Sequence, residues 1–545
     1  MSISNKDDRA GVKASVTTIM NLKGKNAPLA WQKRNDICDL IVAALKREGK
    51  FYSFCGQHLF VDSDTREIIP LAKCHKWFRL LYSFGVNPAS EEANYVLASV
   101  LANADFKRTV VYNMSWWDEA QPALYINEYA NNILKITPTG ITRIRNGDDD
   151  VLMIDGETAG CEPLAADIEK AATIEHSLTD FSSSLIIKQL FDTVIYSKEG
   201  VGRENSLLIL MTALIGLFFY ERVPAYPFIY FHGPGGSIKT SAAVRVGKLL
   251  QGKTFQQTGA DNLGPEELKV MATNMSFIVL DEANELKKLL DAMKVIATGG
   301  MDVRREYYTT LDIRKSPYQA RVWMTANNVS LTHETISSRM MLMDIAARPE
   351  KKPYRSDYHV GKEFDRNGCW TELVGRLAAA MRELHAADLA GKSDLNIEDR
   401  MSAFFVFGQV LANDNGIGEK YEAAREAMRV RQNQQAAEGN PLVMLVRRLS
   451  PVHNMTLVGG KATGLRTAEE WSPILLQVVG FSDSALRNKV ASVAWLRQML
   501  NNNQHTLQGE CGMVTLQDDK RSPKLYGFTG CRGLGAPSPV VEVMD

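Results

Sequence analysis

Phe228-Ile-Tyr-Phe-His-Gly-Pro-Gly-Gly-Ser-Ile-Lys-Thr-Ser241 decides the fold, because it joins an apolar run to a glycine-rich loop and then to a helical pattern. The apolar run predicts a buried strand. Glycines let backbone N–H groups converge on phosphate oxygens, and the start of the following helix adds partial positive charge. The segment therefore predicts a phosphate-binding loop. The residues expected to bind ATP are Gly233, Pro234, Gly235, Gly236, Ser237, Ile238, Lys239, Thr240 and Ser241.

The last residues of this loop carry distinct expected roles. Lys239 is expected to reach the β- and γ-phosphates, and the Thr240 hydroxyl is expected to bind Mg²⁺. The pattern departs from GxxxxGK[ST] at Ile238, where the last glycine belongs. That glycine lets the loop pass close to the β-phosphate, so Ile238 is expected to affect nucleotide affinity. A glycine-rich turn before an ordinary helix is the alternative interpretation.

A second apolar run, Ser276–Leu280, ends in Asp281 and Glu282 about 40 residues after the loop. The run predicts a buried parallel strand, and ligands bind at the carboxyl ends of such strands. Asp281 is expected to hold Mg²⁺ through water, and Glu282 to orient and activate the attacking water. A capped strand end is the alternative.

Two later segments complete the candidate site. Val322–Ala326 is another apolar run, and Asn327 after it is expected to hold the attacking water, with Asn328 as a close rival. A turn-forming asparagine pair is the alternative. Arg339 precedes the apolar run Met340–Ile345 and suits an arginine finger, because guanidinium matches phosphate geometry. A surface salt bridge is the alternative for Arg339.

Outward from the site, the sequence pattern divides the chain. Residues 1–165 mix helical and strand-like runs, and residues 166–225 are predicted to be helical. Residues 226–350 alternate strands and helices, which is typical of a parallel sheet. Residues 351–438 are again predicted to be helical. Residues 440–545 contain predicted helices followed by a short hairpin, the order of a winged-helix domain.

Composition restricts the function classes. The 545 residues include 63 basic and 63 acidic side chains, so the net charge of zero argues against a protein that coats nucleic acid nonspecifically. A local basic channel stays compatible with that balance. The seven cysteines are widely spaced without a CxxC pair, which predicts neither a disulfide framework nor a zinc ribbon and favours a reducing compartment.

The sequence also lacks membrane signals. Its N-terminus is polar, so no signal peptide is expected. The longest apolar run, Leu207–Tyr220, is shorter than the roughly 18 residues that a membrane span needs, so a buried helix is predicted. These features predict a cytoplasmic protein of a bacterial host cell, with no membrane partner. The aspartates of residues 148–150 follow Asn146-Gly147 and are interpreted as a solvated turn, not as a metal site.

The order of these motifs resembles that of AAA+ ATPases. Within them, the chain is similar to superfamily 3 type helicases of phages and mobile genetic islands, including their self-loading replicative helicases. Three segments add to the resemblance: Ala297–Gly300 with Arg304–Tyr308, Thr309–Ala320, and Arg400–Gly408. The resemblance covers roughly residues 170–435. It implies an α/β AAA+ P-loop core with a mixed α+β N-terminal domain, helical flanking regions and a small winged-helix-like C-terminal domain.

The resemblance implies a ring of six subunits, with ATP and Mg²⁺ between neighbours. Arg339 would then act on the next subunit. A hairpin formed by Thr309–Ala320, with Arg314 and Lys315 at its tip, would move along single-stranded or forked DNA. Its contacts would go mainly to phosphates.

The C-terminal domain is expected to bind duplex origin DNA or a protein partner. The expected DNA-facing residues are basic and lie on a helix and a wing. They are Arg487, Lys489, Arg497, Lys520, Arg521 and Lys524.

Two other functions fit the same nucleotide residues. One is an AAA+ ATPase that remodels or loads a partner, or acts in phage defence, without unwinding DNA. The other is a nucleotide-binding scaffold with little turnover, which Ile238 makes plausible. Residues 1–165 lack the zinc motif and clustered acids of a typical primase, so priming is not predicted.

Overall fold

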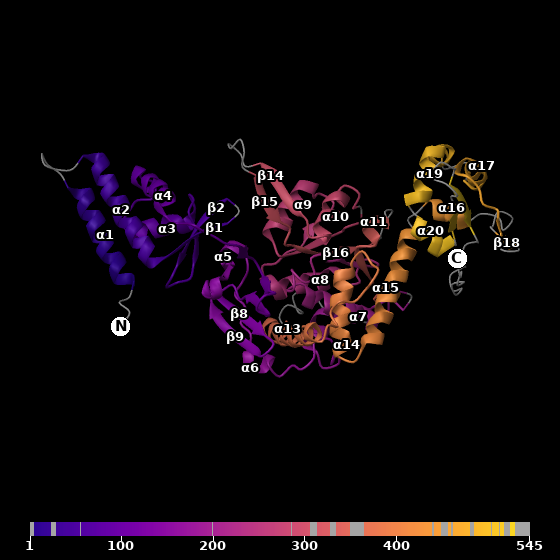
Figure 1. Cartoon of the computed structure of the whole chain (residues 1–545), viewed down its shortest axis with the longest axis horizontal. Helices are drawn as coiled ribbons and strands as arrows, with labels where there is room; N and C mark the ends of the chain where they lie inside the picture. Colours follow the sequence, from indigo (N-terminus) through magenta and orange to yellow (C-terminus); the bar gives the residue numbers. More distant parts are fainter. Residues whose placement is uncertain are drawn as a thin grey trace.

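The computed structural model describes most of the chain. The described ranges are 5–22, 29–54, 56–198, 200–284, 286–305, 313–327, 334–348, 364–438, 441–447, 456–458, 461–479, 484–502, 504–511, 513–516 and 524–528. Asn328, Lys520 and Arg521 lie outside them, so their expected roles are not addressed by the structure. Figure 1 shows the N-terminal helices at one end, the central sheet with its helices in the middle, and the C-terminal helices at the other end.

Five parallel strands form the central sheet, in the spatial order β12-β13-β16-β11-β17. Nearly every residue of the four longer strands is buried, as expected for a sheet covered on both faces. The strands are β11 (Phe228–His232), β12 (Thr258–Gly259), β13 (Phe277–Asp281), β16 (Arg321–Ala326) and β17 (Met340–Asp344). Because parallel strands end at the same edge, the loops after β11, β13 and β16 converge there.

Helices connect these strands, so the predicted parallel sheet with alternating strands and helices is confirmed. The helices are α8 (Lys239–Gln251), α9 (Pro265–Asn274), α10 (Leu290–Ala297) and α11 (Glu334–Ser337). Pro265 at the first turn of α9 suits a helix start, because proline fixes a helical φ and has no N–H to leave unpaired.

An antiparallel hairpin of β14 (Met301–Arg305) and β15 (Ile313–Pro317) projects beside α9 and α10 (Figure 1). The register pairs Arg304 with Arg314 and Val303 with Lys315. The expected placement of Arg314 and Lys315 at the tip is therefore wrong. They lie in the second strand, because the hairpin begins at Met301, earlier than the predicted Thr309.

Residues 166–225 form less helix than predicted. One long helix, α7 (Arg203–Gly216), follows the single turn α6 (Ile168–Ala171) and a short π-helical turn, η2 (Ile187–Phe191). Irregular backbone persists here because side chains of α13 satisfy its polar groups: Glu372 accepts bonds from the Leu185 and Ile186 N–H groups at 2.7 and 3.1 Å. The run around α7 is buried as predicted, with Ser206 to Gly216 all inside. Within the described ranges, every helix falls short of the length and apolar character that a bilayer crossing requires.

Three longer helices follow the sheet, as predicted for residues 351–438. They are α13 (Arg366–Leu389), α14 (Ser402–Asp414) and α15 (Gly418–Glu438). Helix α15 lies along the edge strand β17, where the Gln432 amide donates to the Met340 carbonyl at 2.6 Å. The Met428 sulfur accepts from the Leu342 N–H at 3.2 Å. The edge of the sheet is thus covered by a helix.

The N-terminal part contains two separate antiparallel-rich sheets. The first joins β1 (Gly49–Phe54), β2 (Gln57–Asp62), β3 (Ile68–Pro70) and β4 (Lys107–Arg108), and it packs with α1 (Asn5–Asn21), α2 (Ala30–Glu48), α3 (His75–Ser83) and α4 (Glu91–Asn103). The second joins β6 (Ser115–Asp118), β7 (Ala123–Asn127), β8 (Asn132–Thr137) and β9 (Gly140–Arg145). A short parallel pair, β5 (Val111–Tyr112) and β10 (Leu152–Met153), lies between, followed by α5 (Gly156–Ala159).

The second sheet belongs to the central hydrophobic core. Leu124, Ile126 and Leu134 pack in the same cluster as Phe231 of the phosphate-loop strand. The three aspartates after Asn146-Gly147 sit in the turn η1 (Asp148–Asp150) and pair with Arg66, Lys135 and Lys107 respectively. Each of these aspartates therefore faces a basic side chain.

The C-terminal part has its own core around Trp471. Its helices are α16 (Pro441–Arg447), α17 (Ala468–Val478), α18 (Ser484–Ala491), α19 (Val493–Asn502) and α20 (Gln504–Cys511), with hairpins β18 (Thr456–Val458)–β19 (Lys461–Thr463) and β20 (Met513–Leu516)–β21 (Leu525–Phe528). Helices α18 and α19 are separated at Ser492, whose hydroxyl accepts from the Trp495 N–H at 3.4 Å.

Candidate nucleotide site

The glycine-rich loop leaves β11 at a place where only glycine fits. Gly233 has φ 157°, and a Cβ built there would collide with the Ile345 carbonyl oxygen. Its N–H donates to the Ala326 carbonyl at 3.3 Å, which ties the loop to the end of β16. Gly236 has φ 74°, in the left-handed region. The loop ends where Lys239 opens α8, so the predicted order of strand, loop and helix is confirmed.

Ile238 occupies a backbone conformation that favours glycine. Its φ is 67° and its ψ is 13°, which is left-handed helical. For a β-branched residue this conformation is strained by about 1–3 kcal/mol. Ile238 thus stands in place of glycine at a position whose backbone conformation favours glycine.

Lys239 and Asn327 meet at the carboxyl edge of the sheet. The Lys239 ammonium donates to the Asn327 side-chain oxygen at 2.8 Å and to the Pro234 carbonyl at 3.1 Å. Lys239 is buried at 6% exposure, and this burial lowers its pKa, while the Asp281 carboxylate opposes the effect. The ammonium is therefore held under the loop, where phosphates would add their charge to that of Asp281.

Thr240 and Asp281 form the expected metal corner. The Thr240 hydroxyl donates to Asp281 Oδ1 at 3.0 Å, and the Glu282 N–H donates to the same oxygen at 3.0 Å. A hydroxyl and a carboxylate oxygen are hard ligands, and Mg²⁺ takes one or two such groups while keeping several waters. The donor set fits Mg²⁺.

Glu282 stands exposed next to this corner. Its φ is 55°, a second left-handed conformation for a non-glycine residue. The backbone around it is fixed: the Ala283 N–H donates to the Thr325 carbonyl at 2.9 Å, and the Asn327 N–H donates to Asn284 Oδ1 at 3.0 Å. Strained backbone that the surroundings hold in place is common at functional sites. The Glu282 side chain is therefore exposed to solvent at the carboxyl edge of the sheet, where Asn327 also lies.

Arg339 is not brought to this edge. Its carbonyl accepts from the Phe228 N–H at 2.8 Å, so it lies where β11 begins, whereas the loop starts where β11 ends. A strand of five residues spans about 16 Å. The side chain is half-buried, and burial lowers its pKa, with Arg400 nearby adding to the effect. One cluster at the carboxyl edge of the sheet thus contains Lys239, Thr240, Asp281 and Asn327. Arg339 lies at the opposite edge, where the strands begin.

Sequence reasoning missed Thr325. Its hydroxyl donates to Asp281 Oδ1 and lies 3.4 Å from the Thr240 hydroxyl. The signal was present, because strand β16 ends beside β13 and a polar Thr interrupts its apolar run. Leu280 pairs with Met324, which brings the next residues of the two strands together.

Sequence reasoning also missed a charged cluster beside the loop. Asp344 ends β17 and receives both Arg431 Nε, at 2.9 Å, and Arg431 NH2, at 2.9 Å. His232 Nε2 lies 3.6 Å from Asp344. Burial lowers the pKa of His232, and Arg431 and Lys239 lower it further, against the Asp344 carboxylate. Arg431 comes from α15, nearly 200 residues later in the chain, so no local pattern could link it to His232.

A cavity of about 490 Å³ opens along α8 beside the metal corner. Its lining includes Thr240, Ser241 and the basic residues Arg245, Lys248 and Lys253. The Thr240 end of the site therefore faces a positively charged space.

No family model and no curated protein match this chain. Among solved structures, one described as an active helicase, Cch of SCCmec type IV, has a TM-score of 0.43 and 11% identity, covering 88% of this chain and 92% of that one. The apo C-terminal region of NrS-1 has a TM-score of 0.36 and 9% identity, covering 90% and 98%. At these values the likeness carries no argument about this chain. The proposal below rests on the geometry of the site.

Proposed function

We propose that this chain is an ATP-driven, ring-forming AAA+ helicase or translocase that separates DNA strands during replication of a phage or mobile element. One observation carries the proposal. Two hydrogen-bonded pairs, Lys239–Asn327 and Thr240–Asp281, lie next to each other at the carboxyl edge of a five-stranded parallel sheet. Parallel sheets bind ligands at that edge.

Each residue of the cluster has a chemical task in this proposal. Lys239 would bind the terminal phosphates, and Thr240 and Asp281 would hold Mg²⁺ with its waters. The metal supplies positive charge to the phosphates. Glu282 would orient and activate a water, and Asn327 would position that water by its amide. Thr325 keeps Asp281 aimed at Thr240 by its hydrogen bond.

Arg339 would act on the neighbouring subunit. Its distance from the loop of its own chain supports a role at the interface between subunits, six of which would form the ring. An arginine delivered from a partner stabilises the charge that develops in the transition state.

The hairpin β14–β15 would contact the DNA strand through Arg314 and Lys315. Both residues lie in β15, on a hairpin that stands away from the sheet. In the C-terminal part, helices α18 and α19 and the hairpin β20–β21 would bind duplex origin DNA. Arg487 and Lys489 lie on α18, while Arg497 on α19 pairs with Glu469. Both helices supply basic side chains for contact with DNA phosphates.

The first experiment measures ATP hydrolysis by the wild-type chain and by Glu282→Gln. We expect the variant to lose at least 100-fold in rate while still binding ATP, because a general base contributes about 10²–10⁴-fold. Equal rates in the two proteins would reject the enzyme and favour a nucleotide-binding scaffold.

The second experiment measures strand separation and DNA-stimulated hydrolysis with Arg314→Glu and Lys315→Glu combined. Both activities are expected to be lost, because reversed charges repel the phosphates. If both activities persist, the helicase assignment fails. A wild-type ATPase that never separates strands would instead support a loader, remodeller or phage-defence ATPase.

A further inference from the structure

A second cavity, of about 270 Å³, lies between the N-terminal sheet and the central part of the chain. The N-terminal walls come from β1, β2, β3, β5 and the segment around α5. The opposite wall comes from the end of α9 and the residues after β15. Ligand sites of small molecules begin near this size. The space therefore suits one ring system and not a folded peptide.

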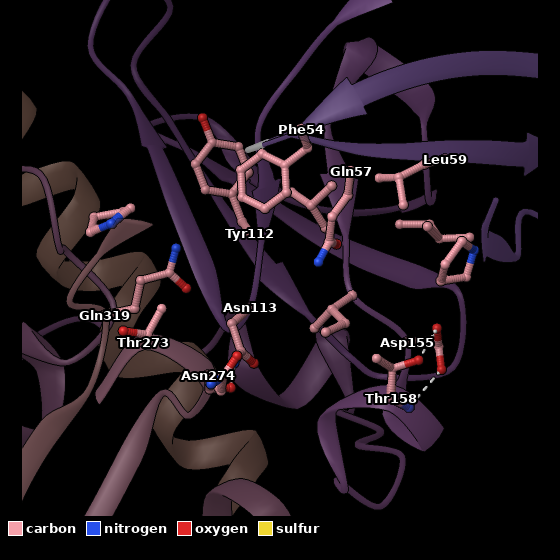
Figure 2. A pocket seen from close by; sticks show the side chains of 15 residues that line it. Phe54, Gln57, Leu59, Tyr112, Asn113, Asp155, Thr158, Thr273, Asn274 and Gln319 are labelled. Atoms are coloured by element: carbon pink, nitrogen blue, oxygen red, sulfur yellow. Dashed lines mark hydrogen bonds between the residues drawn. The ribbon is translucent and has the colours of Figure 1, made fainter. Parts of the chain in front are cut away.

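The lining combines aromatic rings with neutral amides. Figure 2 shows Phe54 and Tyr112 together on one side, Gln57 beside them, and Asn113 below. Trp116 stacks on Tyr112 with ring centroids 5.2 Å apart and planes at 19°, which holds the tyrosine ring in place. Rigid aromatic rings next to amides are the groups that proteins use to stack and hydrogen-bond nucleobases.

One amide in this cavity has an unmet hydrogen bond. Asn113 Nδ2 donates to the Asn274 carbonyl at 3.1 Å, but Asn113 Oδ1 is buried without a partner. A buried acceptor without a donor costs about 1–3 kcal/mol, so a ligand N–H would be favoured there. The exocyclic amino group or ring N–H of a base supplies that donor.

The cavity is also electrically neutral. Among the described residues that line it, Asp155 is the one charged residue, and it is paired with Lys76 and hydrogen-bonded to Thr158 (Figure 2). A phosphate would find no cation among these described lining residues. The base of a nucleotide fits the interior, and its sugar and phosphate would stay outside.

The position of the cavity links it to the hairpin. Pro317 closes β15 and lines the cavity, two residues after Lys315. Gln319 follows, and its backbone N–H is anchored on the Ala272 carbonyl at 2.9 Å, while its side chain faces the space with Thr273 (Figure 2). A strand whose phosphates lie along β15 would therefore end up next to one wall of the cavity.

We propose that this cavity takes up one unpaired base of single-stranded DNA, stacked near Phe54 and hydrogen-bonded by Asn113 and Gln319. The proposal rests on the proposed function, because the strand must first lie along β14–β15. The captured base would fix the register of the strand between successive steps of the hairpin.

The test compares two single strands of equal length, one with bases and one abasic, by fluorescence anisotropy with the full chain. We expect Phe54→Leu and Gln319→Ala each to weaken binding of the base-containing strand by about 10-fold, since stacking of one base is worth about that much. Binding of the abasic strand should not change. Phe54→Leu keeps an apolar side chain, and Gln121→Ala, an exposed glutamine outside the cavity, is the matched control.

The possible outcomes distinguish failure of the cavity proposal from failure of the proposed function. If the wild type binds both strands equally and the two variants change neither, the cavity proposal is overturned while the helicase proposal stands. If the wild type binds neither strand, the proposed function fails first. If free deoxyadenosine binds to the wild type and the variants lose that binding without any loss on the strand, the cavity serves a nucleoside and the proposal is overturned.

Discussion

Two residues at the nucleotide site, Ile238 and Glu282, have φ angles of 67° and 55°. The hydrogen bonds of its neighbours hold Glu282 in place, which suits a side chain that would have to point at an attacking water. Ile238 is half-buried, and its strain comes from a β-branched side chain in a backbone conformation that favours glycine. This difference makes Ile238 the better position for a stabilising substitution.

We predict that Ile238→Gly stabilises the chain by about 1 kcal/mol and tightens ATP binding. Glycine adopts positive φ without steric cost, although it adds freedom to the unfolded chain, so the gain is smaller than the full strain. Chemical denaturation measures the free energy of unfolding, and equilibrium binding of a non-hydrolysed ATP analogue measures affinity. Lys248→Gly, inside α8 where the backbone is helical, is the control and should lose about 1 kcal/mol. A loss at Ile238 equal to that of the control would contradict the prediction.

His232 makes the free energy of unfolding depend on pH, in a direction that follows from the shift of its pKa. Its pKa in the folded chain is lowered, first by burial, from an unfolded value of about 6.5. The unfolded state therefore binds more protons just below that value, so this histidine's contribution is complete above about pH 6.5 and declines as the pH falls. We predict that the melting temperature drops less between about pH 7.5 and 5.5 in His232→Gln than in the wild type. A steeper drop in the variant would mean that Asp344 raises the pKa of His232 more than burial lowers it.

At the scale of elements, Gly408 sets how closely α14 approaches its neighbours. A Cβ there would collide with the Tyr421 hydroxyl of α15 and lie 2.8 Å from Thr212 Cγ2 of α7. Tyr421 is fully buried and has no room to move. We predict that Gly408→Ala lowers the free energy of unfolding by about 1–3 kcal/mol, despite alanine's better helix propensity.

Gly11 is the matched control for that substitution. It lies in helix α1 with nothing within 4 Å of an added Cβ. Gly11→Ala should raise the free energy of unfolding by about 0.4–1 kcal/mol through the unfolded state alone. Denaturation curves of the two variants give both values. Equal effects at the two positions would show that helix propensity, not packing, decides the outcome at Gly408.

The elements also show what a sequence can and cannot reveal. The strand Phe228–His232, the loop and α8 were predictable, because their apolar run, glycines and helical spacing are local. Residues 166–225 were not, since Glu372 of α13 satisfies backbone groups near Leu185 from far along the chain. The break at Ser492 rests on one short-range hydrogen bond and the hairpin start at Met301 on strand pairing, and neither leaves a strong sequence pattern.

The residues of the candidate site likewise include some that the sequence could predict and some that it could not. Asp281 and Asn327 were predictable because each ends a buried strand, and parallel strands end together. Asp344 and Arg431 were not, because their contact joins β17 to α15 across the fold. The residues that share a strand end could be found from the sequence, and those that meet through packing could not.

At the scale of the whole molecule, the proposed role of Arg339 involves a second copy of the chain. It lies at the start of β11, about 16 Å along the strand from the loop, so it cannot serve Lys239 of its own chain. If Arg339 acts on the neighbour, Lys239→Ala and Arg339→Ala are each inactive alone for different reasons. Mixed rings of the two variants then contain sites with an intact Lys239 from one subunit and an intact Arg339 from the next.

We predict that an equal mixture of Lys239→Ala and Arg339→Ala recovers about one quarter of the wild-type ATPase rate. In a closed ring of head-to-tail interfaces, each site takes its two halves independently, so about one site in four is complete. The recovery should need time for subunit exchange and should be absent when the variants are measured separately. A mixture with no more activity than its components would mean that Arg339 has no role across the interface. Robust activity of Arg339→Ala alone would show that the arginine is a structural residue at the start of β17.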